Sequence, residues 1–314
     1  MGFFTPSYDK PGKGIDPDAP QKRSFFRFFD IFFRKFWKFI KINLLYVLVS
    51  IPTFALVFFL SGIISNSFLS MNGTEEMFRS IAEQIAQASE NAGGADYQYS
   101  ILVVTFDLFI RLIISYLFMT LWGMGPATAG ITYILRNFAR EEHAWLWSDF
   151  KSSFKNNFKQ SLIVFVIDIV VFLLLYTAFV VYSQMTGALS MLKYFIVVIA
   201  IIYTIIHFYI YPMMVTFDLK LKDLYRNALI FALGKLPSNL FILVILLLIH
   251  VGSAFAAVVY GGNYAMLVLF VVLLLEILLL QSFSAFLINF NTYPKMKSYM
   301  FEKDDTSENI SQDL

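Results

Sequence analysis

The sequence predicts an all-α integral membrane protein with six transmembrane helices, arranged as three hairpins with cytosolic amphipathic elbow helices and both termini inside. The 314 residues are 58% hydrophobic and only 15% charged, whereas a soluble domain carries about 25% charged residues. Six apolar runs each reach the roughly 20 residues that a helix needs to cross a ~30 Å hydrocarbon layer. Lys and Arg fall almost entirely on one side of these runs, as the positive-inside rule requires.

The apolar runs set the expected domain organisation. Lipid offers backbone groups no hydrogen-bond partner, so spans of this composition are expected to be helices. The predicted spans are residues 42–64, 101–124, 162–182, 192–217, 240–260 and 264–290. Around them we expect a cytosolic N-terminal segment (1–23), a membrane domain (24–297) with an outside segment (65–100), and a disordered cytosolic tail (298–314).

The orientation follows from the basic residues. The segments placed in the cytosol contain 21 of the 24 Lys and Arg residues; they are 1–41, 125–161, 218–237 and 291–314. The outside segment 65–100 is acidic instead, and its residues Met77, Phe78, Ile81 and Ile85 predict one face of a short amphipathic helix that ends near Asn91.

The stretch FFRFFDIFFRKFWKFIK, residues 25–41, combines aromatic rings with positive charge. Its charged residues recur every three or four positions, so they share one side of a helix. This pattern indicates a helix lying at the membrane surface, where Lys and Arg reach anionic lipid headgroups; the alternative is a buried core helix with one wet edge. The residues expected at the interface are Arg27, Arg34, Lys35, Trp37, Lys38 and Lys41.

A repeat is visible where the chain enters and leaves the cytosol. The entries FWKFIKINLLYVL, FKNNFKQSLIVFV and ALGKLPSNLFILV each place a basic residue, then Asn or Ser, before continuous apolar sequence. The three exits contain Pro126, Pro212 and Pro294, where we expect the chain to break or turn. The alternative is that every hairpin entering from the inside needs basic residues first, without a structural repeat.

A few polar residues lie inside the predicted spans. Asp107, Arg111, His250 and Glu276 form the candidate intramembrane polar cluster, since ionisable groups inside a bilayer usually face a bundle interior and find partners. We predict that Arg111 and Glu276 face the same interior, although Arg111 can also pair with Asp107 four residues away. The cluster is either a polar pathway through the membrane or a set of contacts between helices that fix how the hairpins pack. Asp168 and His207 are expected nearer the cytosolic end.

The cytosolic segment 127–160 mixes charges with large rings. Two interpretations stay open: a docking surface for a cytosolic partner, and an elbow helix lying on the membrane with Trp at the interface. The candidate docking residues are Arg136, Arg140, Trp145, Trp147 and Phe150.

The composition argues against several classes of function. There is no Cys, and the three His residues are scattered, so thiolate chemistry and a His-rich metal site are not expected. No nucleotide-binding or hydrolase motif is present. A net charge of +2 gives no reason to expect nucleic acid as a partner. We expect a protein that is not an enzyme and needs no cofactor.

Several stretches together resemble one known family. The N-terminal PGKGIDPDAPQKRSFFRFFDIFFRKFWKFIKINLLYVL, the segment GPATAGITYILRNFAREEHAWLWSDFKSSFKNNFKQS and the later DLYRNALIFAL are similar to the YesL-like family of bacterial integral membrane proteins, a domain of unknown function. The resemblance implies a bacterial plasma membrane and a setting of carbohydrate uptake. It favours a non-enzymatic accessory or assembly component of a carbohydrate ABC importer, with permease or ATPase subunits as partners. The alternative is an independent transporter or channel for a small solute.

Overall fold

The computed structural model describes residues 23–70, 73–88, 94–253, 255, 259 and 262–300, and within these residues the chain is helical without a strand. The predicted N-terminal segment (1–23) and the predicted tail (298–314) lie almost wholly outside the described residues. The helices are α1 (Ser24–Arg34), α2 (Phe36–Leu60), α3 (Gly62–Leu69), α4 (Thr74–Ala88), α5 (Ala95–Leu121), α6 (Pro126–Ala139), α7 (Leu146–Asn156), α8 (Phe158–Gln184), α9 (Leu192–Met214), α10 (Leu221–Gly234), α11 (Leu236–Leu247), α13 (Ala265–Leu275) and α14 (Gln281–Met300).

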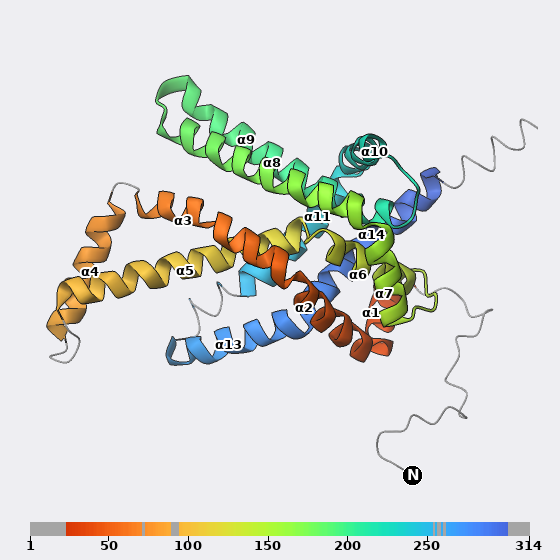
Figure 1. Cartoon of the computed structure of the whole chain (residues 1–314), viewed down its shortest axis with the longest axis horizontal. Helices are drawn as coiled ribbons and strands as arrows, with labels where there is room; N and C mark the ends of the chain where they lie inside the picture. Colours follow the sequence, from red (N-terminus) through yellow and green to blue (C-terminus); the bar gives the residue numbers. More distant parts are fainter. Residues whose placement is uncertain are drawn as a thin grey trace, which may run out of the picture.

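Short segments of other helix types join these elements. Two 3₁₀ turns, η1 (Gly187–Met191) and η3 (Gly262–Tyr264), lie at hairpin ends. Two π-helical turns, η2 (Leu248–Gly252) and η4 (Glu276–Leu280), interrupt the last two spans. Figure 1 shows the α8–α9 hairpin, the α3–α5 pair and α13 extending to the left from a hub where α6, α7 and α14 lie.

The structure supplies five or six of the six expected spans. Five helical segments are long and apolar enough to cross a membrane, and α10 with α11–η2 forms a sixth candidate that bends by 92° at its joint. Only 11–28% of the residues in the most apolar window of each of the five are buried inside the protein. Apolar side chains therefore cover the outside of the bundle, and only lipid can shield a surface of this kind from water.

The first four observed spans begin earlier than the predicted ones, and the last begins later, at Leu267 rather than residue 264. The first runs from Phe36 rather than residue 42, and the second from Ala95 rather than residue 101. The polar residues at each entry continue the same helix, because backbone hydrogen bonding propagates past the hydrophobic boundary.

The sequence repeat is also a repeat of backbone geometry. A single residue separates each short helix from the span that follows it, and the three joints have similar dihedral angles. They are Lys35 (φ −107°, ψ 14°), Asn157 (φ −99°, ψ 5°) and Lys235 (φ −123°, ψ 30°). The three short amphipathic helices α1, α7 and α10 are thus set off by equivalent joints. The prediction of one continuous helix over residues 25–41 is wrong, because the helix breaks at Lys35.

The prolines behave differently from one another. Pro126 begins α6 after a sharp reversal, in which Gly123 and Gly125 adopt φ of 89° and 60° that other residues rarely tolerate. At Pro212 and Pro294 the predicted break is wrong, since both lie inside helices α9 and α14. Transmembrane helices tolerate proline because neighbouring groups satisfy the freed carbonyls.

Helix α6 forms the centre of the hub. Twelve of its fourteen residues are buried, and it contacts α1, α2, α7, α8, α9 and α14. Small residues permit the close approach; a Cβ on Gly130 would lie only 2.5 Å from the ring of Phe150 in α7. The interpretation of residues 127–139 as a surface element is therefore wrong, because this helix is buried on nearly every side, its polar residues Thr132, Arg136 and Asn137 included.

Helix α1 packs on protein with one side and is exposed on the other. Phe28 stacks on Phe286 of α14 at a centroid distance of 4.9 Å, and the guanidinium of Arg27 lies 5.1 Å from the centre of the Phe290 ring. The exposed side carries unshielded rings, with Phe25 and Phe33 each about two-thirds exposed. The buried side agrees with the interpretation of a core helix, and contact of the exposed side with lipid headgroups stays a prediction.

Two further residues expected at the lipid surface also have protein partners. Arg34 forms an ion pair with Glu141 at 2.9 Å. The Lys35 ammonium lies 4.0 Å from the centre of the Phe138 ring and donates to the carbonyl of Glu142 at 3.3 Å. Trp37, Lys38 and Lys41 remain exposed.

The amphipathic helix predicted in the outside segment is present as α4. Its buried face is formed by Phe78 and Ala82, which pack toward α5, whereas Met77, Ile81 and Ile85 are exposed. The apolar face was therefore predicted only in part, and the expected end near Asn91 lies outside the described residues.

Candidate functional site

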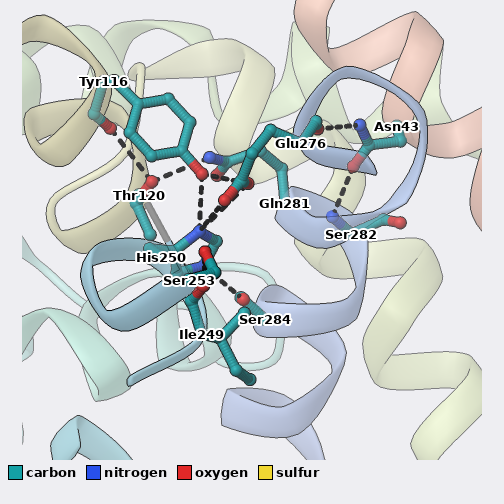
Figure 2. Close-up of polar contacts among 10 residues, drawn as sticks. All are labelled: Asn43, Tyr116, Thr120, Ile249, His250, Ser253, Glu276, Gln281, Ser282 and Ser284. Atoms are coloured by element: carbon teal, nitrogen blue, oxygen red, sulfur yellow. Dashed lines mark hydrogen bonds and ion pairs between the residues drawn. The ribbon is translucent and has the colours of Figure 1, made fainter. Parts of the chain in front are cut away.

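A buried cluster of polar side chains joins the second span to the last two spans. We call Tyr116, His250 and Glu276 the Glu276 cluster. The Tyr116 hydroxyl donates to the Glu276 carboxylate and lies 2.5 Å from His250 Nδ1, which is itself 3.0 Å from Glu276 Oε1. Figure 2 shows the three side chains converging on one point. His250 and Glu276 are each only 5% exposed.

Further polar groups extend the cluster on two sides. His250 Nε2 lies 2.7 Å from the Ser284 hydroxyl. Gln281 Nε2 donates to the Thr120 hydroxyl at 2.7 Å, and Thr120 lies one turn beyond Tyr116 in α5. Both ring nitrogens of His250 therefore have partners, and the hydrogen-bonded set reaches from α5 to α14 (Figure 2).

His250 and Glu276 both lie on π-helical turns. His250 is the central residue of η2, and Glu276 is the first residue of η4. Such turns are rare in helices and often occur at functional sites, because the wider turn leaves backbone groups free and redirects side chains. Here both turns direct an ionisable side chain into the same interior.

Asn43 of α2 braces the second of these turns. Its Nδ2 donates to the carbonyls of Glu276 at 3.0 Å and Ile277 at 2.7 Å. Its Oδ1 accepts from the amide of Ser282 at 2.6 Å. One fully buried side chain thus satisfies backbone groups on both sides of the π turn and links the first hairpin to the last.

Arg111 does not join the Glu276 cluster. Its Nε lies 2.9 Å from both carboxylate oxygens of Asp107 in the same helix. The Ser65 hydroxyl donates to Asp107 at 2.5 Å, and the guanidinium packs over Gly62 of α3. The predicted four-residue set is therefore two separate sites, and the predicted meeting of Arg111 with Glu276 is wrong. Asp107 satisfies Arg111 locally.

A second acid–histidine pair occurs between α8 and α9. We call Asp168, Tyr203 and His207 the Asp168 cluster. His207 Nε2 lies 3.0 Å from Asp168 Oδ1, and the Tyr203 hydroxyl donates to the same oxygen at 2.7 Å. The Trp122 ring stacks beside His207 at 6.0 Å. The Asp168 side chain is fully buried.

The candidate docking residues divide into buried and exposed groups. Arg136 is 6% exposed and donates to the Val215 carbonyl at 2.6 Å; burial, then the nearby Arg140 charge, lowers the pKa of Arg136. Phe150 is 3% exposed and packs against Gly130, whereas Trp145 and Trp147 are 69% and 63% exposed. Arg140 is exposed and pairs with Glu142. Arg136 and Phe150 are thus structural rather than available for docking.

The sequence reasoning missed Tyr116, Asn43, Gln281 and Ser284. A signal was present, because the polar residues of QSFS at 281–284 interrupt an apolar run and Tyr116 and Thr120 are one turn apart. Within the described part of the chain, no group of three or more His, Asp or Glu side chains is placed to hold a metal ion.

One comparison with known proteins gives a match. Residues 102–179 match a family model described as "Protein of unknown function, DUF624". This region contains Tyr116 and Asp168 but neither His250 nor Glu276. No curated protein and no solved structure matches the chain. The chain is therefore similar, over about a quarter of its length, to an uncharacterised family, and its helices are those of a multi-pass membrane protein.

Proposed function

We propose that the protein moves protons across the membrane, alone or together with a small solute, and that Glu276 is the group that binds and releases the proton. The observation that carries the proposal is the convergence of Glu276, His250 and Tyr116, from three spans, at two π turns. A buried carboxyl group beside an imidazole and a phenol can change its protonation state with its partners already in place.

The depth of the cluster agrees with this function. His250 lies fifteen residues after the joint at Lys235, about 22 Å along a helix at 1.5 Å per residue. That distance places it within a ~30 Å hydrocarbon layer if the joints lie at its surface. The distribution of Lys and Arg supports placing both termini, the joints and the short helices in the cytosol.

Proton movement in vesicles tests the proposal. Purified protein would be reconstituted with phosphatidylethanolamine and phosphatidylglycerol, a pH gradient imposed, and the internal pH followed with a dye, first alone and then with a panel of sugars. We expect the wild type to dissipate the gradient faster than Glu276→Gln in at least one condition. Equal rates in every condition, with both proteins folded by size-exclusion chromatography, would contradict the proposal.

A second function is favoured by the exposed indoles of Trp145 and Trp147 at the start of α7. We propose that they contact a cytosolic partner, such as the permease or ATPase subunits of a carbohydrate ABC importer, for which this chain would be an accessory component. Exposed Trp side chains often anchor protein interfaces.

Co-purification tests this second function. Replacing Trp145 and Trp147 by Ser should release importer subunits that copurify with the wild type in mild detergent. Trp37→Ser, at an equally exposed residue on α2, is the control. Retention of the same subunits by the double variant would contradict docking, and so would their absence from the wild-type preparation.

A further inference from the structure

A small cavity lies between the Glu276 cluster and the Asp168 cluster. It has a volume of about 50 Å³ and is lined by residues of α2, α5, α6, α9 and α14, together with the turn after α5. Thr120 and Gln281, which extend the Glu276 cluster, border one part of it, and His207 of the Asp168 cluster borders another. Of the two clusters themselves only His207 lines the cavity, and the Glu276 cluster reaches it through Thr120 and Gln281.

Buried polar atoms face this cavity without a partner. Neither ring nitrogen of His207 makes an aligned hydrogen bond, although Nε2 lies 3.0 Å from Asp168 Oδ1. Asn289 Oδ1 is also without a partner, while its amide nitrogen donates to the Ala285 carbonyl at 2.7 Å. The two residues are 4% and 1% exposed. Leaving such groups unsatisfied in an apolar interior costs about 1–3 kcal/mol each.

The size and lining of the cavity indicate what fills it. A water molecule needs about 10–15 Å³ of such space and two to four polar partners, so the cavity has room for a few waters. No Asp, Glu, Lys or Arg side chain lines it, which disfavours an ion as the occupant. We infer that a cluster of water molecules occupies the cavity, hydrogen-bonds His207 and Asn289, and joins the two acid–histidine clusters into one polar path.

The inference rests on the proposed proton movement, because a water cluster between the two clusters would carry a proton from one to the other. The titratable groups around His207 are Asp168 of α8, Tyr203 and Tyr211 of α9, and Tyr46 of α2, which lines the same cavity. Asp168 is the one carboxyl group among them, and its Oδ1 lies 3.0 Å from His207 Nε2.

Histidine NMR tests whether the cavity is wet. The chain has only three His residues, so ring-¹⁵N signals in lipid bilayers can be assigned by substitution. We expect magnetisation transfer from water to the His207 ring nitrogens in the wild type. His143, which is exposed, is the positive control. No transfer to His207, with clear transfer to His143, would overturn the inference.

A cavity-filling variant tests the path. Ala285 lines the cavity, and Ala285→Val should remove the water signal at His207 and slow proton movement; Ala178→Val in α8, away from the cavity lining, should change neither. Unchanged proton movement in Ala285→Val, after the water signal is lost, would overturn the path. If Glu276→Gln alone stops movement, the proposed function stands and this inference fails. If His207 is wet but the wild type moves no protons, the proposed function fails.

Discussion

The side chain of Asn43 and the backbone of Glu276 are held together by hydrogen bonds, although 233 residues separate them in sequence. The contact places the first span against the π turn that carries the buried carboxyl group. It fixes where Glu276 begins its turn, and thereby where its side chain meets Tyr116 and His250. The Glu276 cluster therefore depends on a residue of the first hairpin that takes no part in the cluster itself.

Replacing Asn43 by Leu should destabilise the protein and disorder the cluster. The change leaves two carbonyls and one amide of the π turn without their side-chain partner, at a cost of about 1–3 kcal/mol for a buried group. Thermal denaturation in detergent measures the loss. Asn66→Leu, at an exposed residue of α3, is the control, and equal melting temperatures for the two variants would show that Asn43 is not a brace.

The separation of Arg111 from Glu276 can be tested with double-mutant cycles. Arg111→Gln should couple strongly to Asp107→Asn, because Asp107 is its direct partner at 2.9 Å. Two residues in contact show coupling energies of about 0.5–3 kcal/mol, whereas the stability changes caused by mutations at distant sites simply add. The losses of thermal stability caused by Arg111→Gln and by Glu276→Gln should therefore add up in the purified double variant. Strong coupling between Arg111 and Glu276 would mean that the two sites share one network.

Gly130→Ala should loosen the packing of α7 on α6. The new methyl group would lie 2.5 Å from the Phe150 ring, so the ring or the helix must move, which typically costs about 1–3 kcal/mol. Gly234→Ala is the matched control, since nothing lies within 4 Å of the added carbon there. Adding Phe150→Leu to Gly130→Ala should recover part of the loss. A Gly130→Ala protein as stable as the control would exclude this close contact.

Lys35 should make stability depend on alkaline pH. Burial, followed by the charges of Lys38 and Arg34, lowers the pKa of Lys35 to about 8. The unfolded chain keeps its ordinary pKa of 10.5, so it binds more protons between these values and stability rises with pH. The unfavourable contribution is fully present below about pH 8 and is relieved as pH rises toward 10.5.

The Lys35→Met variant isolates this effect. Unfolding midpoints measured between pH 7.5 and 10 should rise less with pH in Lys35→Met than in the wild type, since Met cannot titrate. Lys41→Met, at an exposed residue of the next helix turn, should keep the wild-type slope. Parallel slopes for all three proteins would assign the pH dependence to other groups.

The sequence by itself determined the class of protein and the order of its spans. Long apolar runs admit only helices in lipid, and the basic residues mark the short helices that precede each hairpin. The repeated entries predicted a short basic helix before each hairpin, but the joints that separate these helices from the spans were not predicted. The sequence showed that Glu276 and His250 need polar partners, since an ionisable group inside a span usually pairs with another polar group.

The tertiary structure decided which residues meet. Arg111 and Glu276 were both placed by depth alone, and depth does not specify the face of a helix or the direction of its neighbour. Helix α6 looked like a surface element because it follows a span, yet its small residues allow six other helices to bury it. The partners of Tyr116 and Asn43 became visible only when spans distant in sequence were packed together, because these hydrogen bonds cross between helices.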